Sequence, residues 1–124
     1  MDWSSLNYND AGLVTVVAQD YRSGEIRMLA HANQEALQAT EETGFAHFFS
    51  RSRARLWMKG ESSGNRLHVY DVWFDCDRDA VIYHVEAEGP SCHTGAESCF
   101  FTKAEMSKVA AGARCLPVIH ALES

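Results

Sequence analysis

The stretch LHVYDVWFDCDRDAVIYHVEA, residues 67–87, carries the pattern that decides the fold. Both of its ends are rich in β-branched and aromatic residues, which favour strands, whereas its middle is acidic. The pattern predicts one strand over Leu67–Asp77 and a second over Ala80–Ala87, with a short acidic turn between them.

The turn region between these two strands carries three carboxylates and a thiol in the run Asp75-Cys76-Asp77-Arg78-Asp79. Side chains alternate along an extended strand, so the three aspartates are expected on one face and Cys76 on the other. Carboxylates select hard ions such as magnesium, whereas thiolates select zinc. The spacing therefore predicts two separate metal positions on opposite sides of one strand end.

Two further cysteines follow in the run CHTGAESC, residues 92–99. With Cys76, the thiols of Cys92 and Cys99 fill three of the four positions of zinc. The open position can hold a water whose pKa zinc lowers to about 7, as in hydrolytic sites. Adjacent residues bind one ion only with strain, so we expect His93 to stand free as an acid/base group. From the cysteines alone, a structural zinc site with His93 as the fourth ligand is equally compatible.

Upstream segments predict the other elements. Leu13–Asp20 and Glu25–Ala30 have the composition of two strands joined by a turn, which predicts a hairpin. Asn33 is predicted to cap a helix, QEALQATEET, that ends at Gly44. Shorter strands are expected over Phe45–Ser50 and Leu56–Met58.

Downstream, Thr102-Lys103-Ala104-Glu105 is a capping-box pattern, which predicts a second short helix ending near Gly112. Strands outnumber helices and follow one another along the chain. We therefore expect an α+β fold: one compact domain over residues 1–124, with a mixed, strongly curved sheet and two short helices.

A basic segment lies between the helix predicted to end at Gly44 and the strand predicted to begin at Leu67. Five of the eleven basic residues of the chain lie between positions 51 and 66, among serines, glycines and an asparagine. Arginine side chains and exposed backbone N–H groups bind phosphate, so the segment suits a phosphorylated small molecule. The candidate contacts are Ser50, Arg51, Arg53, Lys59, Ser63, Gly64 and Asn65. Taken alone, such a run is more commonly a solvated turn.

Length and composition restrict the class of protein. The chain has 124 residues, the size of one domain, and a net charge of −6, which argues against nucleic-acid binding. No apolar run approaches the roughly 20 residues that span a bilayer, and residues 1–5 lack the pattern of a signal peptide. We therefore expect a cytoplasmic protein with no membrane partner. In the cytoplasm thiols stay reduced, so the four cysteines are expected to be ligands or core residues rather than disulfides.

Two known metal motifs fit poorly. A calcium-binding EF-hand requires glycine where this chain has Ala80, and predicted strands rather than helices flank the turn. The zinc deaminase signature H-x-E…P-C-x-x-C partly matches residues 84–86 and 90–92. However, six residues rather than two separate Cys92 from Cys99, so the match is superficial.

Together the motifs resemble those of the phosphoribosyl-AMP cyclohydrolase family of histidine biosynthesis. The resemblance runs from about residue 12 to residue 101 and is carried by VAQDYRSGEIRMLAHANQEAL, AHFFSRSRARLWMKGESSGN, DCDRDA and GPSCHTGAESCFF. The chain departs from the family at His31 and Ala32, where an aromatic residue and methionine are usual, and near Arg66-Leu67, where Thr-Gln is frequent. These positions lie outside the metal motifs. The departures therefore concern substrate contacts or packing and not the reaction.

The resemblance implies a set of site residues. Zinc would be bound at Cys76, Cys92 and Cys99, and magnesium at Asp75, Asp77 and Asp79. It also implies a homodimer with sites near the subunit interface.

The implied reaction opens the adenine ring of 1-(5-phosphoribosyl)-AMP. N1-alkylated adenine is electron-poor at C6, so a hydroxide can add there, and zinc supplies hydroxide near neutral pH. Collapse of the adduct breaks the N1–C6 bond and leaves a carboxamide and a formimino group, without loss of ammonia. His93 is placed by sequence to move the protons. The alternative is a zinc-stabilised binding module without catalysis, although such a module has no use for three closely spaced aspartates.

Overall fold

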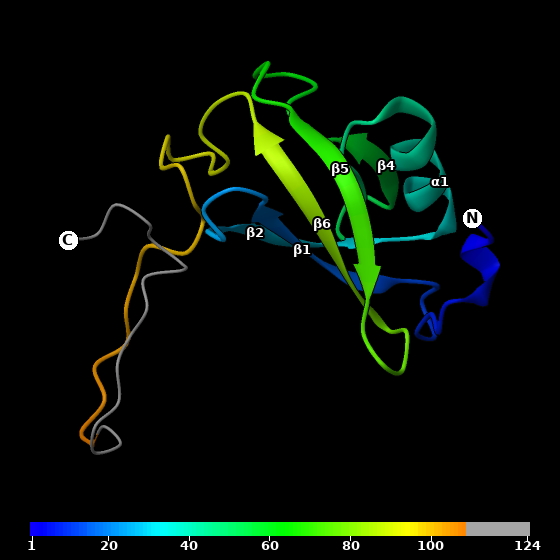
Figure 1. Ribbon diagram of the computed structural model, residues 1–124, viewed down its shortest axis with the longest axis horizontal. Coiled ribbons are helices and arrows are strands. Elements are labelled where there is room, and N and C mark those ends of the chain that lie inside the picture. Colours follow the sequence, from blue (N-terminus) through cyan, green and yellow to red (C-terminus); the bar gives the residue numbers. More distant parts are fainter. Residues whose placement is uncertain (109–124) are drawn as a thin grey trace.

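The computed structural model describes residues 1–108 of the chain. Its main layer is a four-stranded sheet in the order β2-β1-β6-β5, and β3 and β4 form a second, two-stranded sheet (Figure 1). The strands are β1 (Val14–Asp20), β2 (Ile26–Ala32), β3 (His47–Ser50), β4 (Arg55–Met58), β5 (Leu67–Phe74) and β6 (Ala80–Ala87). β1 pairs in parallel with β6 and antiparallel with β2, so the sheet is mixed, as predicted. Among residues 1–108, no helix is both long and apolar enough to span a bilayer.

The predicted first helix is confirmed as α1 (Gln34–Thr43). The Asn33 side chain accepts a hydrogen bond from the N–H of Ala36 at 2.9 Å, which satisfies one of the free donors at the helix start. Gly44 ends the helix at φ 78°, a left-handed conformation that glycine adopts without steric cost. Both ends of α1 are therefore determined by neighbouring residues in the sequence.

The core lies between the main sheet and the layer formed by α1 and β3. Every second residue of β1 and β6 is buried, and these residues pack against Leu37 and Phe48. Tyr83 is fully buried, and its hydroxyl donates to the carbonyl of His47 at 3.1 Å. The hydrogen bond satisfies the hydroxyl and joins the two sheets.

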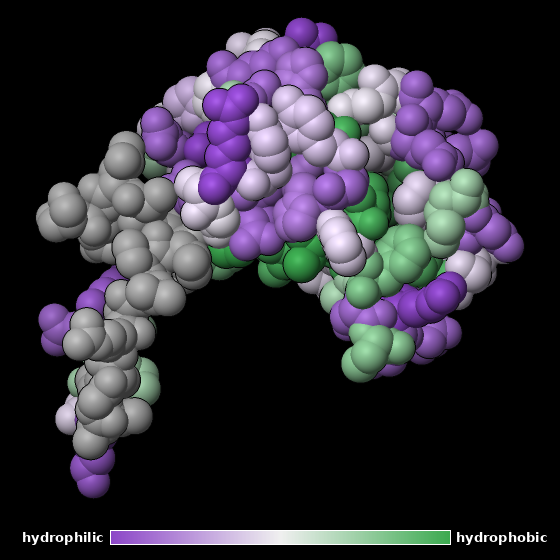
Figure 2. All heavy atoms as spheres, viewed as in Figure 1, coloured by the Kyte–Doolittle hydropathy of each residue, from purple (hydrophilic) through white to green (hydrophobic). Residues whose placement is uncertain are grey.

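The opposite face of the main sheet carries a row of apolar side chains that are partly or largely exposed within residues 1–108. Leu29, Val17, Ile82 and Trp73 lie in register across all four strands. Leu29 is 46% exposed and Trp73 is 59% exposed. Figure 2 shows apolar side chains gathered in a band where β1 and β2 pass below the β5–β6 hairpin, on a surface that is otherwise mainly polar.

The predicted end of the first hairpin strand is wrong. β5 ends at Phe74 rather than at Asp77, and residues 75–79 form a turn. The cause is the Asp75 side chain, which accepts hydrogen bonds from the N–H groups of Asp79 and Ala80 at 3.0 and 3.1 Å. Arg78 completes the reversal at φ 61°. The three aspartates are thus brought together by a turn and not by strand alternation.

The predicted second helix is also wrong where the structure describes it. Residues 102–108 form no helix, and the remainder of that prediction, to Gly112, lies outside the described residues. The side chains of residues 102–108 are all exposed. A short helix without an apolar surface to pack against is marginal in water, whatever its capping pattern. The sequence pattern also missed a 3₁₀ turn, Trp3–Ser5, which Asp2 caps.

Candidate functional site

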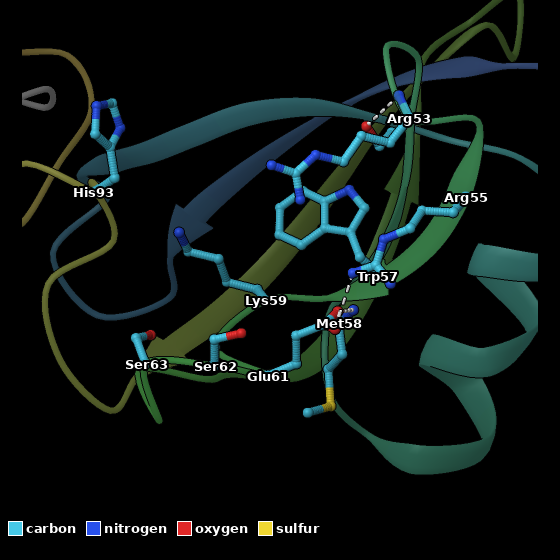
Figure 3. Close-up of a pocket in the computed structure, with 11 residues that line it drawn as sticks. Arg53, Arg55, Trp57, Met58, Lys59, Glu61, Ser62, Ser63 and His93 are labelled. Atoms are coloured by element: carbon cyan, nitrogen blue, oxygen red, sulfur yellow. Dashed lines mark hydrogen bonds and ion pairs between the residues drawn. The ribbon is translucent and has the colours of Figure 1, made fainter.

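A cavity of about 480 Å³ opens beside β4 and the turn that follows it (Figure 3). It is lined by Ser50, Arg53, Arg55, Trp57, Met58, Lys59, Gly60, Glu61, Ser62, Ser63 and His93. All but His93 come from the basic segment. His93 reaches the cavity from the loop that follows β6, on the side away from β4.

The structure divides the predicted phosphate contacts into groups. Ser50, Arg53, Lys59 and Ser63 line the cavity together with His93. Arg51 instead lines a second cavity of about 570 Å³ that also contains His31.

Gly64 and Asn65 line neither of these cavities. The Asn65 side chain packs against Gly89 so closely that a Cβ there would come within 2.3 Å of Asn65 Oδ1. Asn65 therefore contacts the start of the loop after β6.

Trp57 borders both cavities and is half-buried. Trp57 was not among the candidate contacts named from the sequence. Phe48 stacks against one part of the Trp57 ring at a centroid distance of 5.1 Å, which fixes the ring in place. The available signal was its position between Arg55 and Lys59 on a short strand of the basic segment.

The cationic side chains of the main cavity differ in how they are paired. Arg55 forms an ion pair with Glu61 at 3.0 Å. Lys59 donates through Nζ to the carbonyl of Ser91, so it tethers the loop after β6. The Arg53 guanidinium forms no ion pair with any group in residues 1–108. Arg53 is therefore the lining cation with its donors most available to a ligand.

The loop after β6 brings two of the predicted zinc ligands together. Backbone hydrogen bonds from the N–H of Ser91 to the carbonyl of Glu97 and from the N–H of Cys92 to that of Ala96 bring Cys92 and Cys99 near one another. Hydrogen bonds from the hydroxyl and N–H of Thr94 lower the pKa of Cys92, and the hydroxyl lies 3.1 Å from its sulfur. Partial burial, and then the charge of Cys92, raise the pKa of Cys99. Two thiols this close are a fitting donor pair for a soft metal ion.

The predicted third zinc ligand lies elsewhere in the chain. Cys76 is in the turn between β5 and β6, whereas Cys92 and Cys99 follow the other end of β6 (Figure 1). Each strand has eight residues, so the two ends of the hairpin are roughly 25 Å apart at about 3.3 Å per residue. Within one chain the structure does not bring the three cysteines together.

The turn at the other end of the hairpin gathers the three predicted magnesium ligands. One carboxylate oxygen each from Asp75, Asp77 and Asp79 lies within 4.8 Å of the others. Hydrogen bonds with Asp77 and Asp75 raise the pKa of Asp79 to about 6. Asn7 holds the turn from outside, because its side chain donates to the carbonyl of Asp77 at 2.7 Å. Closely spaced exposed carboxylates are the donor set that a hard divalent cation prefers.

Comparison with known proteins gives one family. The phosphoribosyl-AMP cyclohydrolase family matches residues 28–101. The phosphoribosyl-AMP cyclohydrolase of Rhizorhabdus wittichii is 59% identical over 96 residues, which are 77% of this chain and 77% of that protein. That of Archaeoglobus fulgidus is 49% identical over 104 residues, 84% of this chain and 96% of that protein.

A longer relative matches as well. The histidine biosynthesis bifunctional protein HisIE of Aquifex aeolicus is 54% identical over 105 residues, 84% of this chain. The match covers 51% of that protein, so this chain spans about half the length of the bifunctional relative. The similarity includes the basic segment, both ends of the β5–β6 hairpin and the loop with the paired thiols.

Proposed function

The chain belongs to the phosphoribosyl-AMP cyclohydrolase family, hydrolases of histidine biosynthesis, and from this premise we propose that it opens the adenine ring of 1-(5-phosphoribosyl)-AMP with zinc and magnesium. The observation that carries the proposal is the grouping of His93, Arg53 and Lys59 around one cavity, next to a pair of thiols. A phosphorylated substrate, an acid/base group and a soft metal ion can meet there.

The substrate would bind across Trp57. It has two phosphoribosyl ends, and Trp57 separates two cavities that each contain an arginine: Arg53 in one and Arg51 in the other. The exposed part of the indole suits the face of the adenine ring, since base–aromatic stacking is worth about 1–3 kcal/mol. Each arginine can form paired, charge-assisted hydrogen bonds with a phosphate.

Cys92 and Cys99 would hold zinc together with Cys76 of a second subunit. One chain keeps Cys76 at the far end of the hairpin, so the three-thiol site can be complete only in a homodimer. The partly exposed apolar row from Leu29 to Trp73 offers a surface for subunit contact. When bound, zinc with an open position supplies a hydroxide near neutral pH.

Asp75, Asp77 and Asp79 would hold magnesium. Their three carboxylates lie close together, and a divalent cation would offset their combined negative charge. Because Cys76 lies in the same turn, a homodimer that joins Cys76 to the thiol pair would also carry these carboxylates to the cavity of the partner. The cation could then offset the charge of a substrate phosphate.

His93 would carry the protons. In the proposed reaction it accepts a proton from the attacking water and returns it to N1 as the N1–C6 bond breaks. The reaction adds one water and releases no ammonia. Arg53 and Lys59 would hold a phosphate and so keep C6 within reach of His93.

The reaction can be tested directly on the purified protein with zinc and magnesium. Incubation with 1-(5-phosphoribosyl)-AMP should give a product heavier by the mass of one water, with no ammonia formed. His93→Ala should lower kcat by about 10²–10⁴, the range for general acid–base groups. Ammonia release, or no product with fully loaded protein, would contradict the proposed function.

The shared zinc site can be tested by mixing subunits. Cys76→Ser and Cys92→Ser homodimers should each be inactive. After the two proteins are refolded together in equal amounts, about half of the dimers are mixed, and each of those has one intact site of two, so about a quarter of wild-type activity should return. Recovery of no activity, with mixed dimers present, would contradict a site shared between subunits.

A further inference from the structure

Arg27 lies at an irregularity in β2. Ala18 pairs with Met28, and the next residue of β1, Gln19, pairs with Ile26, so Arg27 has no partner on β1. An extra residue of this kind is a β-bulge, which re-aims a side chain and frees backbone groups from the ladder. Arg27 is nevertheless buried, with 7% of its surface exposed.

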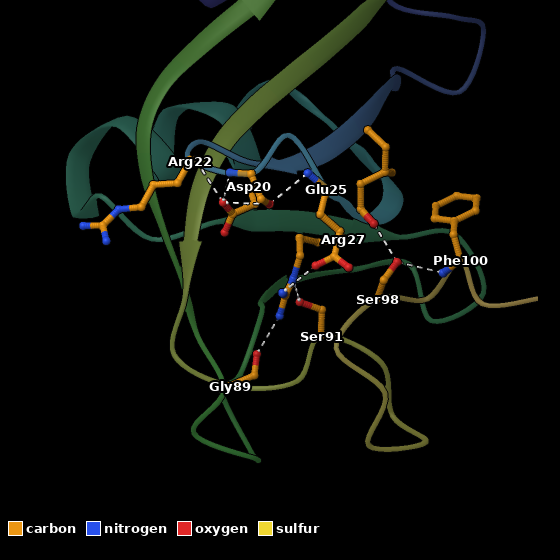
Figure 4. Close-up of polar contacts among 10 residues, drawn as sticks. Asp20, Arg22, Glu25, Arg27, Gly89, Ser91, Ser98 and Phe100 are labelled. Carbon is orange, nitrogen blue, oxygen red and sulfur yellow. Dashed lines mark hydrogen bonds and ion pairs between the residues drawn. The ribbon is translucent and has the colours of Figure 1, made fainter. Parts of the chain in front are cut away.

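Each nitrogen of the Arg27 guanidinium donates one hydrogen bond, and two of these three contacts are on the loop after β6 (Figure 4). Nε donates to the hydroxyl of Ser91 at 3.0 Å, and Nη2 donates to the carbonyl of Gly89 at 3.0 Å. The third contact, from Nη1 to Glu25 at 3.0 Å, balances the buried charge. These contacts hold the segment directly before Cys92.

The backbone at the bulge holds the other end of the same loop. The carbonyl of Arg27 accepts the N–H of Cys99 at 2.8 Å. The hydroxyl of Ser98 donates to the carbonyl of Ile26 at 2.6 Å (Figure 4). The bulge therefore anchors the chain immediately before Cys92 and again at Cys99.

The loop has little else to define its shape. Residues 88–100 contain no helix or strand. The backbone hydrogen bonds inside the loop, such as those from Ser91 to Glu97 and from Cys92 to Ala96, join the loop only to itself. Arg66, His68 and Asn65 contact only Glu88 and Gly89 at the start of the loop. Beyond them, within residues 1–108, the hydrogen bonds that join the thiol loop to the rest of the protein come from Lys59, which donates to the carbonyl of Ser91, and from the bulge.

We propose that Arg27 is a positioning residue, which fixes the distance and orientation of the Cys92 and Cys99 thiols by clamping both ends of their loop. Arg27 does not line the cavity, so it acts through the loop and not on the substrate. Any effect of Arg27 on catalytic turnover rests on the proposed function. The hydrogen bonds that hold the loop, in contrast, do not require a bound metal and can be tested in the metal-free protein.

The main variant changes Arg27→Met and Glu25→Gln together. Removing both charges avoids leaving one of them buried without a partner, and the side-chain volumes are nearly kept. The matched control, Arg22→Met with Glu86→Gln, makes the same chemical change in an exposed ion pair with a 3.6 Å separation. Arg27→Lys is a second variant, which keeps the charge beside Glu25 but loses the planar fork.

Amide hydrogen exchange on the metal-free protein tests the clamp. In the main variant the amides of Ser91, Cys92 and Cys99 should exchange at least ten times faster, with those of β1 and β6 unchanged. The control should match wild type, and Arg27→Lys should fall between. Unchanged exchange in the loop would overturn the proposal, as would an equal increase in β1 and β6, which would make Arg27 a general stabilising residue. If the main variant does not fold, Arg27→Lys decides by the same comparison.

Zinc affinity, measured by competition with a coloured chelator, supplies the second readout. The main variant should bind zinc at least ten times more weakly than wild type, and the control should bind it equally well. Equal affinity in a folded main variant would overturn the proposal. If wild type and Cys92→Ser bound zinc alike, the proposed function would fail while the hydrogen-exchange result would still decide the role of Arg27.

Discussion

The two ends of the β5–β6 hairpin carry the two candidate sets of metal ligands, and they are built differently. At the turn, three carboxylates come from five consecutive residues, and the Asp75 side chain closes the turn with its own hydrogen bonds. At the other end, Cys92 and Cys99 lie in a loop that is shaped by Arg27 and Lys59, which are distant in sequence. The third cysteine is not at that end at all.

The difference concerns how far each site depends on the rest of the fold. A cluster formed by neighbouring residues needs little more than a correct turn, so its substitutions should act locally. A site assembled from several elements loses its geometry when any one of them shifts. Changes to the carboxylates of the turn and changes to the thiol loop should therefore have separable effects on the two metals.

The largest expected effect is at the thiol end. Cys92→Ser removes one of two paired thiols, so the protein should lose most bound zinc and nearly all turnover. Metal analysis and steady-state kinetics on the purified variant check this. A Cys92→Ser protein with full zinc and full activity would mean that this end of the hairpin holds no metal.

Asp77→Asn is the corresponding change at the turn. It removes one of three carboxylates, so the magnesium concentration needed for half-maximal activity should rise about tenfold or more, because affinity for hard ions follows ligand charge. Zinc content should stay near that of wild type. Titration of activity with magnesium, in zinc-loaded protein, measures the effect. Loss of zinc in this variant would show that the two ends are not independent.

Substitutions in the basic segment test whether one substrate molecule occupies both cavities. Arg53→Ala should raise KM about tenfold or more with kcat little changed, since a charge-assisted hydrogen bond contributes about 1.5–3 kcal/mol. Arg51→Ala should do the same from the second cavity if the substrate lies across Trp57.

Arg53 is a cleaner probe than Lys59, which also tethers the thiol loop. Steady-state kinetics on both arginine variants give the comparison. A rise in KM for Arg53→Ala alone would confine the substrate to one cavity.

The smallest effect is expected at Glu88, which lies just before the thiol loop. Hydrogen bonds from Arg66, and then from His68, lower the pKa of Glu88 to about 2. Because the pKa of Glu88 is lower in the folded protein than in the unfolded chain, its ionised carboxylate stabilises the folded state at pH values above about 4.5. This contribution is lost as the pH falls from about 4.5 towards 2. Glu88→Gln should therefore be slightly less stable than wild type at pH 7, with the difference shrinking by pH 3.

Urea unfolding of wild type and Glu88→Gln at pH 7 and at pH 3 measures this difference in stability. The effect should be small because the groups are partly exposed and screened by solvent. If the stability difference between the two proteins grew towards low pH, the pKa of Glu88 would not be lowered in the folded protein.

Elements with local signals could be predicted from the sequence. The helix bounded by Asn33 and Gly44 and the strand over Ala80–Ala87 agree with the structure because their caps and side-chain patterns lie within the elements themselves. The capping-box pattern at residues 102–105 had the same kind of signal but no surface to pack against. The parallel pairing of β1 with β6 joins segments about sixty residues apart, and no local pattern specifies such a partner.

The amino-acid sequence was enough to identify the family and the ligand types of the chain, which are the carboxylates of the turn, the thiols and the basic segment. These follow from residue types and short spacings. The folded arrangement was needed to see that Cys76 lies away from Cys92 and Cys99, that Arg51 and Arg53 line different cavities, and that a bulge at Arg27 holds the thiol loop. The physical reason is that strand pairing and burial set these positions through contacts between distant segments.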